Sequence, residues 1–334
     1  MIDGLLSTAA LSAVLAFVFV GIVRQLAVRH GVLDHPTERS SHSAPTPRGG
    51  GLGLLIAGLG LWAWRASQPV AWTALVPLLG AASVAFIGWL DDRRGLPVRT
   101  RLVVHVLAAI GVGAIAAAHA PSALVAGLLL VVWSGWAVTT INLVNFMDGI
   151  NGLVASQIAI FAVSLALFPG PAETSQSTAF YAVAIGAACL GFLPWNFPRA
   201  RIFLGDVGSG GLGYLVPVLA LMATGSGSTD VVRAHLPLLP LLGDAVWTLI
   251  RRWLNGERIT QAHRSHLYQR LANGGMGHTA VTILYAIIAA FGALVAHASA
   301  GARAPLWISG YVVLTVAAGL VLHRRVSGAA RPLA

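Results

Sequence analysis

Long apolar stretches alternate with short polar segments along the whole chain of 334 residues. A helix needs about 20 consecutive apolar residues to cross a membrane, although shorter glycine-rich spans are tolerated inside a bundle. The sequence therefore predicts an all-α polytopic membrane protein with about eleven transmembrane helices. The expected spans are residues 4–23, 49–64, 70–90, 102–118, 122–141, 153–168, 178–195, 211–224, 236–250, 280–297 and 305–322.

The spans are expected to form one domain, residues 1–334, because no repeat is evident and no polar gap could hold a soluble domain. Residues 4–23 differ from a signal peptide: Asp3 stands where a basic segment would be expected, and the apolar run is too long. We interpret this run as an uncleaved first span.

Composition agrees with this architecture, since 57% of the residues are hydrophobic and only 10% are charged, against about 25% charged in an ordinary globular domain. All 21 basic residues are arginine. With eleven spans, 18 of them fall on one side and three on the other, namely Arg65, Arg233 and Arg303. This asymmetry predicts a cytoplasmic Arg-rich side and C-terminus, with the N-terminus outside.

The net charge of +10 is explained by this topology and by attraction to anionic lipid, so we expect a lipid bilayer and no nucleic acid as partner. The single cysteine, Cys189, lies in an apolar span and offers neither a disulfide nor a cysteine metal motif.

Most acidic residues lie on the Arg-rich side, in short polar islands. Because these islands face one compartment, we expect them to converge on an active site at the cytoplasmic face. The five islands are residues 34–51, 91–101, 142–152, 196–211 and 251–271.

In the island NLVNFMDGING, Asn142, Asn145, Asp148 and Asn151 recur at every third position. This spacing keeps them roughly on one face if the segment is helical. Amides around one carboxylate suit a polar ligand such as a nucleotide. Alternatively, the asparagines satisfy backbone groups at a helix end. We favour the binding role, because polar side chains at the membrane edge are costly.

Asp91 and Asp92 follow a long apolar run in GWLDDRRG. Adjacent residues on a helix point about 100° apart, which predicts different tasks for the two carboxylates. One would reach a metal or phosphate, and the other an arginine or a substrate group. The alternative is a solvated charge patch paired with Arg93 and Arg94, and this motif alone does not decide between them.

In FLGDVGSGG, Asp206 could offer oxygen ligands to a hard cation, and the glycines that follow would let backbone N–H groups approach phosphate. The alternative is a turn that feeds a glycine-tolerant transmembrane helix.

The segment AHRSHLYQR places His263 and His266 three residues apart, with Arg264 between them. Imidazole and guanidinium groups suit a diphosphate better than a transition metal, because a third soft ligand is missing. A basic interfacial helix is the alternative. Two further groups lie within spans: His105, to which we assign no role, and Asp244.

Asp244 lies near the cytoplasmic end of the ninth span. It either neutralises Arg251 or Arg252 or joins the site, and we lean towards the site. Together the islands offer a cation site, a nucleotide-sized polar surface and a phosphate-binding lining. These features indicate phosphoryl transfer at a membrane surface.

Five motifs in order, DHPTERSSHSAPTPRGGG, GWLDDRRG, NLVNFMDGINGL, FLGDVGSGGLGY and HRSHLYQRL, resemble those of the bacterial polyprenyl-phosphate N-acetylhexosamine-1-phosphate transferases, glycosyltransferase family 4. The resemblance covers nearly the whole chain. It implies transfer of a sugar 1-phosphate from a UDP-sugar to undecaprenyl phosphate, with release of UMP and a need for Mg²⁺, for which Mn²⁺ could substitute.

The resemblance also implies roles for single residues. Asp91 and Asp92 match the family's paired aspartates, and Asp206 matches its magnesium ligand. Asp148 matches the nucleotide-site aspartate, while the two histidines of AHRSHLYQR match the cytoplasmic histidine motif.

Three departures from the family pattern narrow the expectation. Asn151 stands where many members have a second aspartate, and Ser265 where a further histidine is frequent. Ser40 and Ser41 precede His42 without the usual lysine, which leaves Arg39 or Arg48 as the candidate cation of the first loop. These departures argue against the peptidoglycan-precursor branch and favour the branch that initiates O-antigen or capsule synthesis.

We therefore expect Asp206 and one of Asp91 and Asp92 to hold the metal, with the other aspartate positioning or deprotonating the lipid phosphate. We expect the asparagines and Asp148 to bind the nucleotide, and the histidines and Arg264 to bind the phosphates or the sugar.

Three other classes fit less well. A transporter of an anionic lipid-linked sugar would favour repeats and charges near the membrane midplane. A CDP-alcohol phosphotransferase would need several aspartates along one helix, which DGING lacks. A purely structural subunit would not require five polar motifs on one side.

Overall fold

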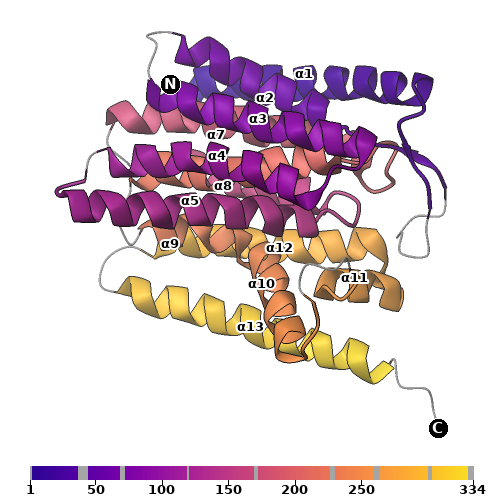
Figure 1. The fold of residues 1–334 in the computed structure, drawn as a ribbon. Coiled ribbons are helices and arrows are strands. Elements are labelled where there is room, and N and C mark those ends of the chain that lie inside the picture. The colour runs from indigo at the N-terminus through magenta and orange to yellow at the C-terminus, as the bar shows by residue number, and fades with distance from the viewer. Residues whose placement is uncertain are drawn as a thin grey trace.

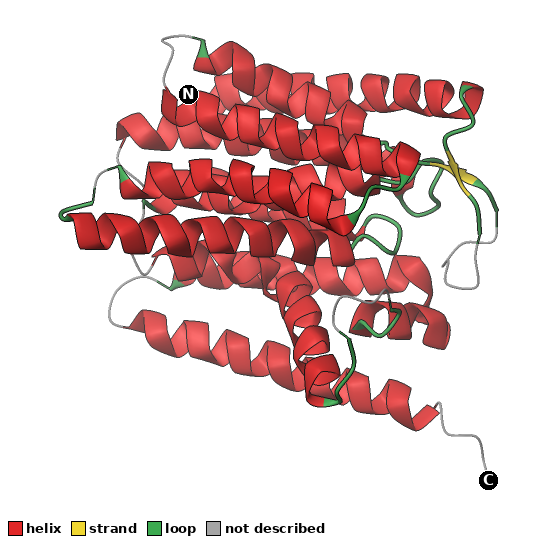
Figure 2. Ribbon diagram, in the orientation of Figure 1, coloured by secondary structure: helices red, strands yellow, loops and turns green. Residues whose placement is uncertain are grey.

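The computed structural model describes residues 2–36, 44–67, 72–118, 120–168, 172–225, 230–258, 263–299 and 303–329. Helices dominate these ranges and run side by side in one bundle (Figures 1 and 2). Two short strands, β1 (Leu33–Asp34) and β2 (Thr46–Pro47), pair antiparallel beyond the helix ends. The prediction of an all-α polytopic membrane protein is confirmed, with this small ladder added to it.

Eight helices of the described chain are long and apolar enough to cross a membrane, and two shorter apolar helices accompany them. Ten of the eleven predicted spans correspond to one of these helices. They are α1 (Ile2–Arg29), α2 (Gly51–Ala66), α3 (Trp72–Arg94), α4 (Val98–Ala117), α5 (Ala123–Phe146), α6 (Leu153–Ala166), α7 (Ala172–Asn196), α8 (Gly205–Thr224), α12 (Gly277–Ala298) and α13 (Ala304–Ala329).

The ninth predicted span, residues 236–250, is not one straight helix. It consists of α9 (Asp230–His235), the 3₁₀ turn η1 (Leu236–Leu238) and α10 (Leu239–Leu254), which runs across the direction of the bundle (Figure 1). Pro237 and Pro240 each lie in the first turn of a new helical segment. Proline lacks an N–H and fits best at a helix start, so these two residues break the span.

After α10 the chain forms the short helix α11 (Leu267–Leu271) and a π-type turn, η2 (Ala272–Met276), which leads into α12. α1 begins at the end of the bundle opposite to that at which α13 finishes (Figure 1). This arrangement agrees with an odd number of passages across the membrane.

Helix α8 forms the centre of the bundle, because 83% of its most apolar stretch is buried. Small residues allow this, because a side chain at Gly208 or Gly213 would collide with α2 or α5. The outer helices differ, since only 6% of the most apolar stretch of α13 is buried. Cys189 is buried within α7. Lipid therefore surrounds a core built around α8.

Several helices extend beyond the predicted spans, and this extension determines where the polar motifs lie. α3 continues to Arg94, so Asp91 and Asp92 occupy its last turns. α8 begins at Gly205, which places Asp206 in its first turn. The polar motifs are thus mostly helix termini.

Candidate active site

Side chains from all five polar islands gather at one end of the bundle, where α3 and α5 finish and α8 begins (Figure 1). The expected convergence of the islands is therefore confirmed. The contributions include Arg48, Asp91, Asn145, Asp206 and Gln269.

Asp92 caps the start of α8 from the neighbouring helix α3. Its carboxylate accepts hydrogen bonds from the N–H groups of Asp206, at 2.9 Å, and Val207, at 3.1 Å. Arg48 Nε lies 2.8 Å from the same carboxylate, whose side chain is only 2% exposed. The first N–H groups of a helix lack partners and carry partial positive charge, so a carboxylate there is stabilising. Asp92 thus fixes the position of α8.

Asp91 lies in a different environment and shares a guanidinium with Asp206. Arg101 Nη1 donates to Oδ2 of Asp91 and, at 3.1 Å, to Oδ2 of Asp206. The two carboxyl groups are themselves within hydrogen-bonding distance. Their side chains are 11% and 22% exposed, against 2% for Asp92. The adjacent aspartates have different surroundings, and Asp91 is the one that faces Asp206.

Asn145 connects α5 to the first turn of α8. Its Nδ2 donates to Oδ1 of Asp206 at 3.0 Å and to Oγ of Ser209 at 2.9 Å. Asn142, in contrast, donates to the carbonyl of Val138 in its own helix at 2.7 Å. It is not among the described residues that line the site cavity, so its contact is the backbone alternative considered for this motif.

A polar cavity of about 240 Å³ opens beside these groups. Asp148 lies on its wall in the segment between α5 and α6. Burial, together with the negative charges of Asp206 and Asp92, raises the pKa of Asp148 to about 7. The described lining consists of Asp34, Arg48, Asn145, Asp148, Gly149, Ile150, Asn151, Asn196, Phe203, Gly205, Asp206, Gln269 and His278.

The end of the first loop is bound to the segment before α8. The N–H groups of Gly50 and Gly51 donate to the carbonyls of Phe203 and Leu204, both at 2.8 Å. Gly205 has a φ of +78°, and a side chain there would collide with Asp92. Only glycine fits this left-handed position comfortably. These contacts hold Arg48 over the carboxylates.

The glycine run of FLGDVGSGG does not present a row of free N–H groups. Gly208, Gly210 and Gly211 lie within α8 and are buried in the bundle, and the helix's first N–H groups are bound by Asp92. The phosphate-cradle expectation for these glycines is therefore wrong, and the alternative, a glycine-tolerant transmembrane helix, is what the structure contains.

His263 and His266 lie together, with ring centroids 4.8 Å apart, in the segment that leads into α11. The pKa of each is lowered to about 4, chiefly by burial. Both imidazoles are therefore neutral at pH 7. Neither histidine, nor Arg264 between them, is among the described residues that line the polar cavity. Their expected role in the reaction stays a prediction.

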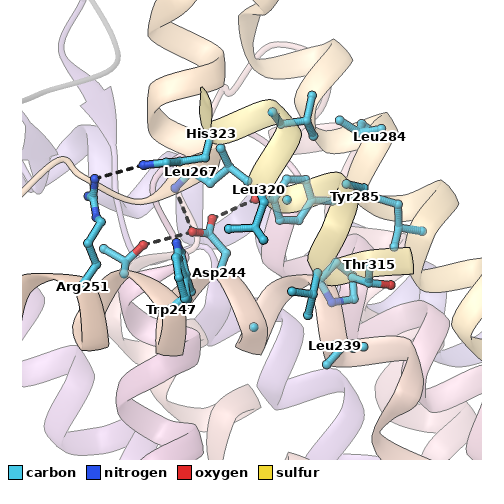
Figure 3. Close-up of a pocket in the computed structure, with 18 residues that line it drawn as sticks. Leu239, Asp244, Trp247, Arg251, Leu267, Leu284, Tyr285, Thr315, Leu320 and His323 are labelled. Atoms are coloured by element: carbon cyan, nitrogen blue, oxygen red, sulfur yellow. Dashed lines mark hydrogen bonds between the residues drawn. The ribbon is translucent and has the colours of Figure 1, made fainter. Parts of the chain in front are cut away.

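Asp244 caps α11 as Asp92 caps α8. Its carboxylate accepts from the N–H group of Leu267, at 2.7 Å, and from the hydroxyl of Tyr285 (Figure 3). It also accepts from the N–H group of Tyr268, at 3.0 Å, and from the hydroxyl of Thr248. Asp244 lines a second cavity and not the polar one. The expectation that it joins the site is not met by the geometry.

The other alternative for Asp244 was an ion pair with Arg251 or Arg252. Among the described residues, Arg252 pairs with Glu257 at 2.9 Å, and Asp244 forms no salt bridge. Asp244 therefore positions α11. Tyr268 extends this link, because its hydroxyl donates to the carbonyl of Phe146 at 3.0 Å, two residues before Asp148.

Two predicted residues, Arg39 and His42, lie outside the described residues. Of the two cations considered for the first loop, Arg48 contacts Asp92 and lies 3.6 Å from Asp206. Asn151 lines the cavity and donates to the carbonyl of Pro198 at 3.0 Å.

Arg101 is the main residue that the sequence analysis missed. It belongs to the second island, but its contact with Asp206 spans 105 positions, which no local pattern reveals. Ser209, beside Asn145, and the cavity residues Asn196, Gln269 and His278 were missed for the same reason.

The side chains of the site suit a magnesium ion, which needs few protein ligands, better than a metal held entirely by protein side chains. In the described part of the chain, no group of three or more His, Cys, Asp and Glu side chains could hold a metal ion. Mg²⁺, however, is commonly held by one or two carboxylates, with waters and substrate phosphates completing its shell. Asp91 and Asp206, adjacent and partly exposed, are such a pair.

Within the described residues, the site combines five carboxylates, two guanidiniums and a polar cavity at one end of a lipid-embedded bundle. The surplus of negative charge suits a divalent cation, and the arginines suit phosphate. Such a fold and site define an integral-membrane enzyme of the phosphotransferase type, in which a polar substrate and a lipid can meet.

Comparison with known proteins identifies the family. The sequence profile of glycosyl transferase family 4 matches residues 74–224. The chain is 31% identical to decaprenyl-phosphate N-acetylglucosaminephosphotransferase of Mycobacterium tuberculosis over 84% of its own length and 80% of the relative's. The chain belongs to glycosyl transferase family 4, and the transferase interpretation is supported over the transporter.

Two further relatives show the breadth of the family. A probable undecaprenyl-phosphate N-acetylglucosaminyl 1-phosphate transferase of Bacillus subtilis is 26% identical, over 95% of this chain and 90% of the relative. A phospho-N-acetylmuramoyl-pentapeptide-transferase of Synechococcus is 30% identical, over 75% of this chain and 71% of the relative.

Proposed function

We propose that this protein transfers an N-acetylhexosamine 1-phosphate, or that of a related deoxy-aminosugar, from a UDP-sugar to undecaprenyl phosphate and releases UMP. The observation that carries the proposal is a cluster of charged side chains beside a polar cavity at the N-terminal end of α8. The cluster consists of Asp91, Asp206, Arg48 and Arg101. The names of the relatives from Mycobacterium tuberculosis and Bacillus subtilis support the sugar phosphate and the polyprenyl acceptor.

The chemistry places few demands on a general base. The second pKa of a phosphate monoester is about 6, so a lipid phosphate is mostly dianionic at neutral pH. The larger problem is to bring this anion to a diphosphate and to stabilise the charge that develops on UMP. Fixed positive groups in a partly dry site meet this need.

Asp91 and Asp206 are the proposed magnesium ligands. Bound there, Mg²⁺ would neutralise charge on the diphosphate and on the leaving group. Arg101 now bridges the two carboxylates and would be released to bind phosphate oxygens. Arg48 would do the same from the other side of Asp206.

Asp92 takes a positioning role in this proposal, because its oxygens already bind the start of α8 and Arg48. The sequence left open which of the paired aspartates is the metal ligand, and the contacts favour Asp91. Arg101, once released from the carboxylates, would hold the attacking lipid phosphate in place.

The polar cavity is the proposed nucleotide and sugar site, with Asn145, Asp148 and Asn151 on its wall. His263, His266 and Arg264 remain proposed ligands of the phosphates or the sugar, as do Arg39 and His42 of the first loop. The histidines would reach substrate as neutral imidazoles, given their low pKa values.

The distribution of arginine supports a bacterial inner membrane location with the site and the C-terminus in the cytoplasm. The cytoplasm is where a UDP-sugar would be available. We further propose a role in initiating O-antigen, capsule or a similar surface glycan, since Asn151 and Ser265 depart from the peptidoglycan-precursor pattern.

The test is UMP release by the purified protein in detergent, with undecaprenyl phosphate, Mg²⁺ and a panel of UDP-N-acetylhexosamines and UDP-deoxy-aminosugars, each with and without EDTA. We expect release that requires the lipid, depends on the sugar and stops with EDTA. Lipid-independent release, or none with any donor, would overturn the proposal.

Variants sharpen the assignment of the metal ligands. With Mg²⁺ at saturation, Asp91→Asn and Asp206→Asn should each lower kcat by at least about 100-fold, because both remove charge from the transition-state site. Glu257→Gln is the matched control, since Glu257 also pairs with an arginine at this end of the protein but lies outside the cavity lining. Full activity of either aspartate variant would remove the assignment.

A further inference from the structure

A second cavity, of about 120 Å³, lies between α10, α12 and α13 (Figure 3). α11 separates it from the polar cavity, because Leu267 lines the second cavity and Gln269 the first. No described residue lines both. The second cavity is therefore distinct from the polar cavity.

The walls of this second cavity are largely apolar, and its rim faces the membrane. Leu239, Leu284 and Ile288 lie along the walls. At the rim, Val316 is 51% exposed and Trp247 is 45% exposed. Since α13 is an outer helix of the bundle, hydrocarbon chains of the bilayer can reach the opening.

Two basic side chains, Arg251 and His323, line one end of the same cavity, and Arg270 lies beside them outside the lining. Arg251 Nη1 lies 3.5 Å from His323 Nε2, and Arg270 Nη1 lies 2.6 Å from His323 Nδ1. The three residues come from α10, α11 and α13, near the end of the bundle where α13 finishes. A basic group at a helix end, beside an apolar cavity, matches an amphiphile with an anionic head.

Among the described cavity residues the one carboxylate, Asp244, forms no salt bridge with this basic group. Asp244 already accepts four hydrogen bonds, from two backbone N–H groups and two hydroxyls. Within the described residues, Arg251 forms no salt bridge: its Nη2 donates to the carbonyl of Ser265 at 3.1 Å, its Nη1 contacts His323, and its buried Nε has no hydrogen-bond partner. Guanidinium donors of this kind bind phosphate well.

We propose that this second cavity binds an anionic phospholipid of the surrounding membrane. The phosphate would lie on Arg251 and Arg270, which His323 holds together, and the first part of one acyl chain would lie between α12 and α13. Bound there, the lipid would connect α13 to α10 and α11.

A membrane phospholipid fits this cavity better than undecaprenyl phosphate does. The phosphate of the acceptor has to reach Asp91 and Asp206, which lie in the other cavity. A phosphate on Arg251 would be on the far side of α11 from these carboxylates. The lipid's effect on the protein would pass through α11, whose Tyr268 contacts the end of α5.

The experiment is native mass spectrometry of the full-length protein released from detergent, with dioleoyl phosphatidylglycerol or dioleoyl phosphatidylcholine added at equal concentration. We expect one phosphatidylglycerol to bind with at least about tenfold preference, as expected when charge-assisted hydrogen bonds hold the head group. This readout does not depend on the transferase activity.

Head-group variants test the basic cluster. Arg251→Gln should reduce the preference by about tenfold, since it removes a phosphate donor, and His323→Gln should also reduce it, since it removes the imidazole that holds Arg251 and Arg270 together. Arg324→Gln is the matched control, because Arg324 follows His323 directly, is exposed and does not line the cavity. It should leave the preference unchanged.

A variant in the apolar wall tests the acyl-chain site without changing the basic side chains. Gly319 lines the cavity, and a side chain there would enter open space, so Gly319→Leu should fill the room for the acyl chain without a clash. Gly310→Leu is the control on the same helix, since Gly310 also faces open space but is outside the lining. Only Gly319→Leu should weaken phosphatidylglycerol binding.

Three results would overturn the proposal. The first is equal binding of the two phospholipids by the unaltered protein. The second is a preference that survives both Arg251→Gln and His323→Gln, or that Arg324→Gln reduces equally. The third is displacement of phosphatidylglycerol by equimolar undecaprenyl phosphate, which would make the cavity an acceptor site.

Discussion

The starts of α8 and α11 are built alike but differ in their surroundings. In both, a carboxylate from a neighbouring helix binds two backbone N–H groups: Asp92 at α8 and Asp244 at α11. Around Asp92 the other groups are charged, with Arg48 in contact and Asp206 next to it. Around Asp244 they are the neutral hydroxyls of Tyr285 and Thr248.

This difference separates a reactive region from a supporting one. Clustered carboxylates repel one another, and such a surplus is typical of sites that bind a cation or a substrate. A carboxylate saturated by neutral donors is complete without a ligand. The same device therefore holds α8 at the candidate active site and the peripheral helix α11 outside it.

The largest expected effect follows from Asp92→Asn. The amide would place an N–H group against the donors of α8 and leave Arg48 without its partner, which should cost about 2–4 kcal/mol of stability. UMP release should fall by at least about 100-fold, because a shift of α8 displaces Asp206. Thermal unfolding and kinetics measure the two. Normal stability and activity would show that the cap is dispensable.

Asp244→Asn should affect stability more than activity, unlike Asp92→Asn. We expect a loss of about 1–3 kcal/mol in stability, from impaired hydrogen bonding at a buried site, but only about a tenfold loss of UMP release. Limited proteolysis near α11 should increase. If activity vanished while the melting temperature stayed the same, Asp244 would belong to the reaction after all.

A smaller effect should appear in the pH dependence of stability. Burial lowers the pKa of His266 to about 4 from an ordinary value of 6.5, so the unfolded chain takes up the proton more readily than the folded one. Its contribution is complete above pH 6.5 and is lost as the pH falls towards 4. His266→Gln should therefore flatten the decline in melting temperature between pH 7 and 5.

The raised pKa of Asp148 has the opposite effect, because it stabilises the folded protein as the pH falls. The melting temperature of His266→Gln should therefore be compared with that of the unaltered protein at each pH. His30→Gln, at the exposed end of the first loop, serves as control. Parallel pH curves for all three proteins would contradict the burial of a neutral imidazole.

The smallest effect is expected at Asn142. Its side chain binds a carbonyl of its own helix, so Asn142→Ala should change UMP release by no more than about twofold. Asn145→Ala, its matched partner one turn later, removes two hydrogen bonds to α8 and should lower activity far more. Equal losses of activity in the two variants would instead support the prediction that both asparagines bind substrate.

The sequence predicted the helices well, because in lipid every backbone group must be bonded within the segment and only long apolar helices achieve this. The break at Pro237 and Pro240 was the exception. Both prolines are visible in the sequence, but the apolar run around them looked continuous. The paired aspartates and Asp206 were also found, since carboxylates beside apolar spans are conspicuous.

Contacts between distant segments could not be predicted in this way. Arg101 reaches Asp206 across 105 positions, and nothing in its own island distinguishes it from the other arginines. The amide stripe failed at Asn142 for a related reason. α5 ends at Phe146, so Asp148 and Asn151 lie beyond the helix, and within it Asn142 bonds to its own backbone while Asn145 reaches α8.

The burial of Cys189 has a practical consequence for mapping this protein. The chain's single thiol is closed off inside α7, which leaves the native protein a nearly silent background for water-soluble maleimides. A cysteine introduced at an exposed helix end, such as Arg94 or Arg303, would then be the one site to react. Labelling intact cells with an impermeant reagent would report directly which ends of the helices face the outside.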